Sequence, residues 1–309
     1  PQLRFPDPTL NRATGFMIPT LSQNSQLGFG AKIPFFLKLG DHKDVLLTPY
    51  LAENTTTLEF RYRQAFKNGN MNWIGAVSND TINPDQPRSY LFGDGAFDLK
   101  RDYKLSFNVK ATSDEAYLLD YDYSDEDRLN SDLTIRRSRR DENTRFALYH
   151  YESLRDNEDN YTLPSIVAVA ETERRYFPKL IGGEARSTLQ LHSHYRTSNS
   201  DVDGSDPDTD ADGRDVTRAT ASLWWRRNWT LKNGMRTGIT SEFAFDGFHT
   251  EQDSVYEGNE YQFTPTIAAH VRYPFSKTGQ DGSRYVIEPV AQVSYTGGNQ
   301  LNIANDENT

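Results

Sequence analysis

The sequence contains no cysteine, and none of its apolar stretches is long. Without thiols, neither a disulfide nor a thiolate metal site can form within these 309 residues. No stretch approaches the roughly 18 to 20 consecutive apolar residues that a membrane-spanning helix requires. Lysine and arginine number 34 against 44 aspartates and glutamates, and the net charge of −10 argues against nucleic acid, which basic side chains hold. If the chain lies in a membrane, it must do so as a closed β-barrel, since only helices and barrels satisfy their backbone in lipid.

Aromatic residues are plentiful although the chain is polar on average. The sequence has 17 tyrosines and 17 phenylalanines, while its mean hydropathy is −0.77. A disordered chain would be poor in aromatics, and a soluble globular domain would carry more leucine, isoleucine and alanine. Apolar residues at every second position give a low mean hydropathy and still build a continuous apolar surface. This composition is typical of membrane β-barrels.

Alternation of apolar and polar residues is clearest over residues 103–112. Tyr103, Leu105, Phe107 and Val109 alternate with polar residues, so in a strand they share one face, which we expect to meet the membrane. Residues 57–66 and 188–196 repeat the pattern. We count about fifteen such stretches, each near the length that a tilted membrane strand needs. The sequence therefore predicts an all-β, antiparallel transmembrane β-barrel, present here as part of a larger one.

The connections between these stretches alternate between short and long. Short connections are predicted at residues 99–102, 140–143 and 232–234, and long ones at about 78–88, 113–130, 153–163, 197–217 and 247–261. Outer-membrane barrels have short periplasmic turns and long external loops, whereas a soluble sandwich has no reason to sort its loops in this way. The alternation favours the outer membrane.

Three groups of polar residues have the residue types of a functional site. Asp208, Asp210 and Asp212 resemble the start of an EF-hand loop, but Ala219 stands where the bidentate glutamate belongs, so a solvated acidic loop is the favoured interpretation. His192 and His194 share a strand face without a third metal ligand nearby in sequence, which favours two wall histidines. The acidic run at residues 120–127 is interpreted as a solvated loop. We expect no enzyme activity, metal or cofactor.

Prolines interrupt the pattern near the start of the chain. Pro19, Pro34 and Pro49 are equally spaced within stretches that otherwise read as strands. Because proline cannot donate to a ladder, these positions indicate either weakly paired N-terminal strands or ordinary strand ends and turns. Physical reasoning alone leaves both interpretations open.

Several segments resemble the LptD family of lipopolysaccharide-assembly proteins. The resemblance is carried by Thr14-Gly15-Phe16-Met17-Ile18-Pro19, Ile33-Pro34-Phe35-Phe36 and Asp44-Val45-Leu46-Leu47-Thr48-Pro49-Tyr50, followed by Leu58-Glu59-Phe60-Arg61-Tyr62-Arg63, Asp127-Arg128-Leu129-Asn130-Ser131-Asp132 and Ile287-Glu288-Pro289-Val290. Leu3-Arg4-Phe5-Pro6 resembles the end of the family's periplasmic domain. The stretch from Pro19 to Tyr50 is the most specific part.

The resemblance implies lipopolysaccharide transport into the outer leaflet of the bacterial outer membrane, through a large barrel that opens sideways. It implies residues 1–13 as a linker from a preceding periplasmic jellyroll and residues 14–309 as the first part of the barrel. Its implied partners are lipopolysaccharide, membrane lipid, the plug lipoprotein LptE and, through the jellyroll, the periplasmic bridge protein LptA. Pro19 and Pro34 match the family's gate prolines by position, whereas Pro49 either matches them or ends the third strand.

Both ends of the sequence read as cuts, so we expect a piece of a longer exported protein. Two other functions fit the strand pattern. The first is a passive porin or a plugged outer-membrane receptor, which needs no weak N-terminal seam. The second is a secreted, non-membrane β-protein that acts as a scaffold.

Overall fold

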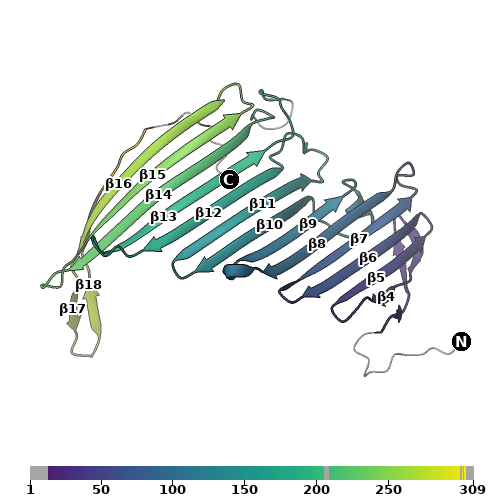
Figure 1. Cartoon of the computed structure of the whole chain (residues 1–309), viewed down its shortest axis with the longest axis horizontal. Coiled ribbons are helices and arrows are strands. Elements are labelled where there is room, and N and C mark those ends of the chain that lie inside the picture. Colours follow the sequence, from purple (N-terminus) through teal and green to yellow (C-terminus); the bar gives the residue numbers. More distant parts are fainter. Residues whose placement is uncertain (1–12, 205–208, 300, 302, 304–309) are drawn as a thin grey trace. The chain divides into compact units, whose positions relative to one another are not determined.

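The computed structural model describes residues 13–204, 209–299, 301 and 303, and these are almost entirely antiparallel strands (Figure 1). The chain divides into two compact units. Unit 1 comprises Pro1–Ile135 and Ala147–Ile166, and unit 2 comprises Arg136–Phe146 and Val167–Thr309. The predicted linker at residues 1–13, with its Leu3-Arg4-Phe5-Pro6 segment, lies outside the described residues except for Ala13.

Unit 1 is antiparallel, and from Phe35 onward strands that follow one another in sequence pair with one another. Before that, Gly15–Phe16 pairs with Phe35–Lys38, and Gly28–Lys32 pairs with both Thr20–Asn24 and Lys43–Ala52. Its elements are β1 (Gly15–Phe16), β2 (Thr20–Asn24), β3 (Gly28–Lys32), β4 (Phe35–Lys38), β5 (Lys43–Ala52), β6 (Thr55–Phe66), β7 (Gly69–Asp80), β8 (Arg88–Asp98), the 3-10 helix η1 (Lys100–Asp102), β9 (Lys104–Thr112) and the short helix α1 (Tyr117–Asp120). The strands β10 (Arg128–Arg139) and β11 (Glu142–Ser153) contribute residues to both units.

Unit 2 continues in the same way. Its elements are β12 (Ile166–Tyr176), β13 (Glu184–Tyr195), β14 (Asp215–Thr230), β15 (Arg236–Glu251), β16 (Gly258–Arg272), β17 (Phe275–Thr278), β18 (Arg284–Ile287) and β19 (Val290–Thr296). Strands β13 to β16 pair in sequence order and β16 pairs with β19. Strands β17 and β18 form a separate hairpin.

The predicted alternation of loop length is confirmed up to residue 235 and is reversed beyond it. Connections at residues 81–87, 113–127, 154–165 and 196–214 alternate with those at 99–103, 140–141, 177–183 and 231–235. Two details differ from the prediction. The loop expected at 247–261 shrinks to 252–257 because β15 and β16 extend their ladder to Thr250 and Gly258. On the short-turn side, residues 273–289 form a long connection that contains the β17–β18 hairpin.

The register gives unit 1 one apolar and one polar face. Val109 faces Gly93, Phe107 faces Gly95 and Leu105 faces Phe97, so the apolar residues of β9 lie in line with those of β8. Tyr103 directly precedes β9. On the other face lie Ser106, Asn108 and Lys110, and residues 57–63 of β6 divide in the same manner between Leu58 and Phe60 on one face and Thr57 and Glu59 on the other.

Aromatic rings cover glycines on the apolar face. Phe60 of β6 is paired with Gly75 of β7, Trp73 of β7 with Gly93 of β8, and Phe107 of β9 with Gly95 of β8. In each pair, a Cβ atom added to the glycine would collide with the opposing ring. The missing side chains therefore leave room for the rings to lie against the backbone of the neighbouring strand.

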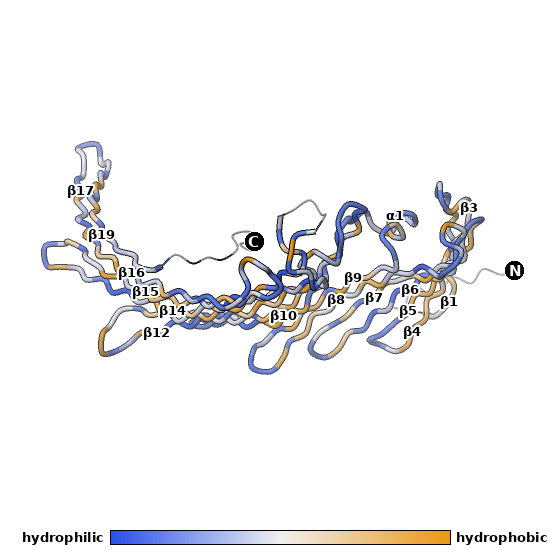
Figure 2. Tube along the Cα trace, turned by 90° about the horizontal axis from the view of Figure 1, so that it is seen from above, coloured by the Kyte–Doolittle hydropathy of each residue, from blue (hydrophilic) through white to orange (hydrophobic). Residues whose placement is uncertain are grey.

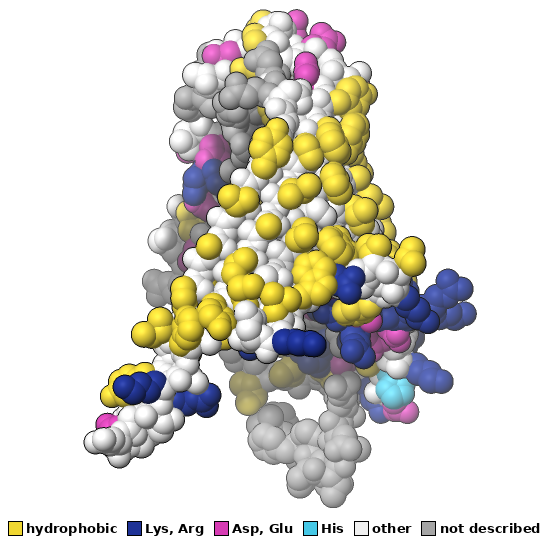
Figure 3. All heavy atoms as spheres, turned by 90° about the vertical axis from the view of Figure 1, so that its left-hand side faces the viewer, with side chains coloured by type: hydrophobic (Ala, Val, Ile, Leu, Met, Phe, Trp, Pro, Cys, Tyr) yellow, Lys and Arg dark blue, Asp and Glu magenta, His cyan; other side chains and the backbone are white. Residues whose placement is uncertain are grey.

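The apolar face of unit 2 is built by the same register. Leu189, Ala221, Phe245 and Phe263 form one cross-strand row, and Leu191, Ala219, Gly247 and Tyr261 form the next. Phe245 and Phe263 are about half exposed, and no second layer of described residues covers them. Figure 3 shows hydrophobic side chains spread over the middle of the side facing the viewer, with Lys and Arg side chains gathered below them. In the described part of the chain, no helix is long and apolar enough to cross a bilayer.

Candidate functional site

The first hairpin of unit 1 is broken in both strands at its prolines. Pro19 lies between β1 and β2, and Pro34 lies between β3 and β4. The two breaks lie side by side, because the backbone N–H of Met17 donates to the carbonyl oxygen of Pro34 over 2.8 Å. On one side of the breaks, β1 meets β4 only through the described pairs Gly15–Phe36 and Phe16–Phe35, and we call β1 and β4 the lower half of the hairpin. On the other side, β2 and β3 pair from Thr20–Lys32 to Asn24–Gly28, and we call them the upper half.

Pro49 continues the same line into the next strand. It lies inside β5 and faces Leu58, so the alternative that it ends the third strand is wrong. Its carbonyl oxygen accepts a hydrogen bond from the N–H of Ile33 over 3.0 Å. Since a strand residue directs its N–H and C=O to the same neighbour, the donor that Pro49 lacks would have faced the broken hairpin. Pro19, Pro34 and Pro49 therefore remove backbone N–H donors at neighbouring positions of three adjacent segments of the sheet.

A loop folds onto the polar face of the sheet beside this hairpin. Residues 113–127 connect β9 to β10 and include α1, which Figure 2 shows on one side of strands β6 to β9. Tyr117 and Leu118 are fully buried and Tyr121 is nearly so. Tyr117 and Tyr121 pack with Leu27 and Tyr50, and Tyr90 and Tyr123 border this cluster. We call residues 113–127 the inward loop, because they fold back over the polar face of the sheet.

A chain of hydroxyl groups joins the inward loop to the sheet. The links are Tyr117 Oη to Ser78 Oγ (2.5 Å), Ser78 Oγ to Thr57 Oγ1 (2.7 Å), Thr57 Oγ1 to Thr55 Oγ1 (2.9 Å), Thr55 Oγ1 to Tyr121 Oη (2.7 Å) and Tyr121 Oη to Asp80 Oδ2 (2.7 Å). An ionised Asp80 only accepts, so Tyr121 donates to it and every earlier hydroxyl donates to the next one along. Each bond in such an ordered chain polarises its neighbour.

Arg88 also binds the inward loop to the sheet through ion pairs. Its buried guanidinium donates to Asp114 at 2.6 Å and to Asp120 at 2.9 Å, and it also lies 3.5 Å from Asp80. Burial opposes ionisation of Asp114, but hydrogen bonds from Arg88 and Ser113 outweigh it and hold the pKa of that carboxyl below its usual range. Burial also raises the pKa of the Tyr121 hydroxyl. The loop is therefore held most firmly when its carboxylates are ionised and its tyrosines are neutral.

The inward loop also holds β2 and β3, the upper half of the broken hairpin, through hydrogen bonds and side-chain packing. The side-chain amide of Asn24 donates to the carbonyl oxygen of Asp120 (3.1 Å) and to Oδ2 of Asp122 (2.7 Å). Leu27, at the β2–β3 turn, is 1% exposed within the tyrosine cluster. Lys32 of β3 donates to Glu59 at 2.5 Å, and Glu59 also accepts from Tyr123 at 3.0 Å. The β2–β3 half of the hairpin is thus anchored to the wall.

The lower half has weaker support. Phe16 of β1 contacts the ring of Phe35 at 4.9 Å between centroids but remains 77% exposed. The side-chain oxygen of Thr14 accepts from the N–H of Lys38. Because the two halves meet at Pro19 and Pro34, the prolines separate an anchored segment from a loosely paired one.

The interpretation of the acidic run as a solvated loop is wrong for Asp120, which is half-buried, whereas Asp122, Asp125, Glu126 and Asp127 are exposed. Asp120 is bound by Arg88 and Asp122 by Asn24. Tyr117, Tyr121 and Tyr123 alternate with these acids, and their rings give the segment an apolar side that a run of acids alone would lack. That alternation of tyrosines with acids was the signal in the sequence.

The remaining predicted polar sites are engaged in local contacts. Asp210 pairs with Arg214 at 3.4 Å, Asp212 accepts from the N–H of Gly204, and Asp208 lies outside the described residues. The rings of His192 and His194 lie 6.1 Å apart, and His194 is bonded to Arg196. Among the described residues, no group of three or more histidines and acids is placed to hold a metal ion.

Comparison with known proteins identifies the family. The model of the family described as LptD, LPS transport system D, matches residues 86–309. The chain belongs to the LptD family. The resemblance found in the sequence is thereby confirmed, although the match begins after the three prolines.

LPS-assembly proteins LptD from three bacteria are similar to this chain. Those of Idiomarina loihiensis, Pseudoalteromonas atlantica and Shewanella oneidensis are each 28% identical, over 36%, 50% and 35% of this chain. The aligned parts cover 15%, 22% and 15% of those proteins, so the chain spans only a fraction of the length of its LptD relatives.

Among solved structures, the chain is similar to Wzi, an outer-membrane carbohydrate-binding β-barrel involved in group 1 capsule assembly in Escherichia coli. The identity is 10%, the match covers 93% of this chain and 80% of Wzi, and the TM-score is 0.23. A likeness at this level adds nothing to the assignment. LptD family membership, together with the antiparallel fold, confirms the prediction of a β-protein of the bacterial outer membrane.

Proposed function

We propose that this chain forms the first part of an LptD barrel, residues 14–309 following a linker at 1–13, and that it carries one leaf of a lateral gate for lipopolysaccharide. The observation that carries this proposal is the row Pro19, Pro34 and Pro49, with β1 held to β4 by a two-residue ladder. A seam with few backbone bonds opens at the lowest free energy.

The anchored and loose halves of the first hairpin suggest where the gate bends. The inward loop holds β2 and β3 through Asn24, Leu27 and Lys32, and nothing comparable is described for β1. In our proposal, the loop side of the sheet faces the cell exterior and the polar face lines the lumen. The moving part of the gate is then β1, which separates from β4 by bending at Pro19 while β2 and β3 stay paired.

The apolar face, with Tyr103, Leu105, Phe107 and Val109 as its example strand, would meet membrane lipid. The polar face would offer the sugar part of lipopolysaccharide and the plug lipoprotein LptE a hydrated interior, and LptA would deliver the lipid through the preceding jellyroll. Arg61, in the middle of β6 on the polar face, favours this orientation, since a basic side chain at mid-depth would cost roughly 2 to 4 kcal/mol if it faced lipid.

Paired cysteines test the gate, because this part of the protein has no thiol of its own. In the full-length protein, Phe16→Cys with Phe35→Cys would lock β1 to β4, and Leu21→Cys with Ala31→Cys would lock β2 to β3 as the matched control. We expect the lower lock to stop lipopolysaccharide export when oxidised and the upper lock to leave export unchanged. Equal export through both locks, each compared with its single-cysteine variants, would refute the proposed leaf.

Replacing both Pro19 and Pro34 by threonine supplies the missing donors with strand-forming residues. We expect slower appearance of lipopolysaccharide at the cell surface with normal insertion of the barrel, which heat-modifiable gel mobility measures. Unchanged export in a normally inserted variant would count against a role for the prolines.

A further inference from the structure

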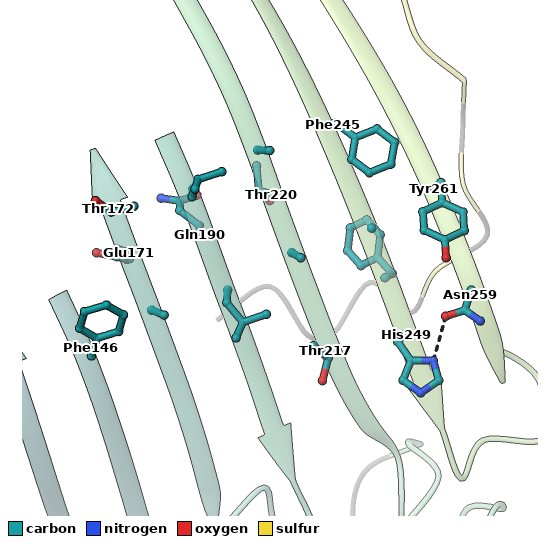
Figure 4. A pocket seen from close by; sticks show the side chains of 17 residues that line it. Phe146, Glu171, Thr172, Gln190, Thr217, Thr220, Phe245, His249, Asn259 and Tyr261 are labelled. Atoms are coloured by element: carbon teal, nitrogen blue, oxygen red, sulfur yellow. Dashed lines mark hydrogen bonds between the residues drawn. The ribbon is translucent and has the colours of Figure 1, made fainter. Parts of the chain in front are cut away.

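A groove crosses the apolar face of unit 2. Its floor is made of small residues, Ala219 and Ala221 on β14 and Gly247 on β15, and Ala219 and Gly247 are directly paired. Figure 4 shows Phe146 on one side of the groove and Phe245 and Tyr261 on the other. The cavity holds about 590 Å³, and Leu189 and Leu191 of β13 line it beside the floor.

The groove has the length of a lipid tail. It runs across the strands from β12, where Ala170 lines it, to β16, where Tyr261 does. Four strand spacings of about 4.8 Å give about 19 Å. The hydrocarbon of one membrane leaflet is about 15 Å thick, half of a typical bilayer core. One extended acyl chain therefore fits, with the glycine and alanines leaving room where larger residues stand on both sides.

One long edge of the groove is polar. Thr217, His249 and Asn259 lie there, toward the ends of β14, β15 and β16 that adjoin the connections 196–214 and 252–257. His249 is bonded through Nδ1 to Oδ1 of Asn259 at 3.0 Å, as Figure 4 shows, and through Nε2 to Glu251 at 2.9 Å. Thr217 is bonded to Ser193 at 2.7 Å. We call Thr217, His249 and Asn259 the polar row.

The chemistry of the polar row selects the kind of headgroup linkage. None of the described residues that line the groove is a lysine or an arginine, the side chains that bind phosphate most strongly. Hydroxyl, amide and imidazole groups instead exchange hydrogen bonds with amides and hydroxyls. An acyl chain joined through an amide and carrying a hydroxyl meets these partners. The ester-linked chains of glycerophospholipids have no donor at that point.

We propose that this groove binds one acyl chain of lipopolysaccharide from the outer leaflet, with the amide and hydroxyl groups of its linkage on the polar row. The side of the membrane rests on the proposed function, which directs the long loops outward. The site lies on the outside of the wall and is separate from the gate hairpin. It would hold a lipopolysaccharide molecule against the barrel in the leaflet where export delivers it.

The test measures binding without export. The full-length protein with its partner lipoprotein would be placed in nanodiscs of synthetic phosphatidylethanolamine, loaded with purified lipopolysaccharide and examined by native mass spectrometry. Ala219→Leu fills the floor of the groove. Ala269→Leu is the matched control, since it adds the same volume on the same face, between Ile239 and Val293 and outside the groove.

We expect Ala219→Leu to lower lipopolysaccharide retention about tenfold and Ala269→Leu to leave it unchanged. Thr217→Val with Asn259→Leu should lower retention of lipopolysaccharide but not of a phospholipid. Equal retention by the two alanine variants would overturn the site, and equal competition by phospholipid would overturn the assignment of lipopolysaccharide. Because the assay does not use the gate, failure of the cysteine locks would leave its result standing.

Discussion

Replacing Tyr121 by phenylalanine removes the last hydroxyl of the chain that joins the inward loop to the sheet, the one that donates to Asp80. That hydroxyl accepts from Thr55 and donates to Asp80, each over 2.7 Å, and both partners are more than nine-tenths buried. Asp80 keeps its contacts with Arg88 and with the backbone N–H groups of Ile82 and Asn83. The variant therefore loses one bond to a charged acceptor and leaves Thr55 without its acceptor.

A hydrogen bond to a charged group contributes roughly 1.5 to 3 kcal/mol, and we take about 2 kcal/mol for the net loss. Since 1.4 kcal/mol corresponds to a factor of ten, the equilibrium constant for lifting the inward loop should rise about 30-fold. Hydrogen exchange of the full-length protein in nanodiscs measures this directly, as a fall in the protection of amides at residues 113–127.

Tyr161→Phe is the matched control, because Tyr161 lies in the connection between β11 and β12 and is 57% exposed. It should leave the protection of residues 113–127 unchanged. If Tyr121→Phe gave the same protection as this control, the hydroxyl chain would not be what holds the inward loop, and the anchoring of the upper hairpin would need another cause.

Three further outcomes follow from the faces of the sheet and from the charges on the loop. Gly95→Leu should destabilise unit 1 by roughly 1 to 3 kcal/mol, because its side chain collides with the ring of Phe107; heat-modifiable gel mobility after refolding measures the folded fraction. Phe107→Arg should cost roughly 2 to 4 kcal/mol in a bilayer while Asn108→Arg costs little, and equal losses in a chemical denaturation series would contradict an outward apolar face. Because the pKa of Asp114 is lowered, its contribution is complete above the ordinary aspartate pKa and is lost as the pH falls through the lowered value. Protection of the inward loop should thus stay constant from about pH 7 to 5 and fall only below about pH 4, whereas a loss near pH 6 would contradict the role of this carboxyl.

The strands could be predicted because their signal is local. Residues 103–112 alternate cleanly, and β9 occupies Lys104–Thr112. Loop lengths follow from the same boundaries, since a strand that begins or ends at a given residue fixes the connection beside it. The breaks at Pro19 and Pro34 were visible for the same reason, because proline acts on its own backbone.

The inward loop and the glycine–ring pairs depend on contacts between distant parts of the chain. Asn24 reaches Asp122, and Thr55 reaches Tyr121, across more than sixty residues. A rule that treats an acidic run as solvated cannot foresee a buried arginine that neutralises it. The position of a glycine opposite an aromatic ring, such as Gly95 opposite Phe107, appears only once the register is known.

A β-sheet is stiff because each strand passes strain to the next through its ladder. Where Pro19, Pro34 and Pro49 follow one another across neighbouring strands, that transmission is interrupted along a line rather than at a point. Thermal bending of the sheet would then be largest along this line of prolines. In the proposed gate, the rest of the sheet stays rigid while this one corner bends.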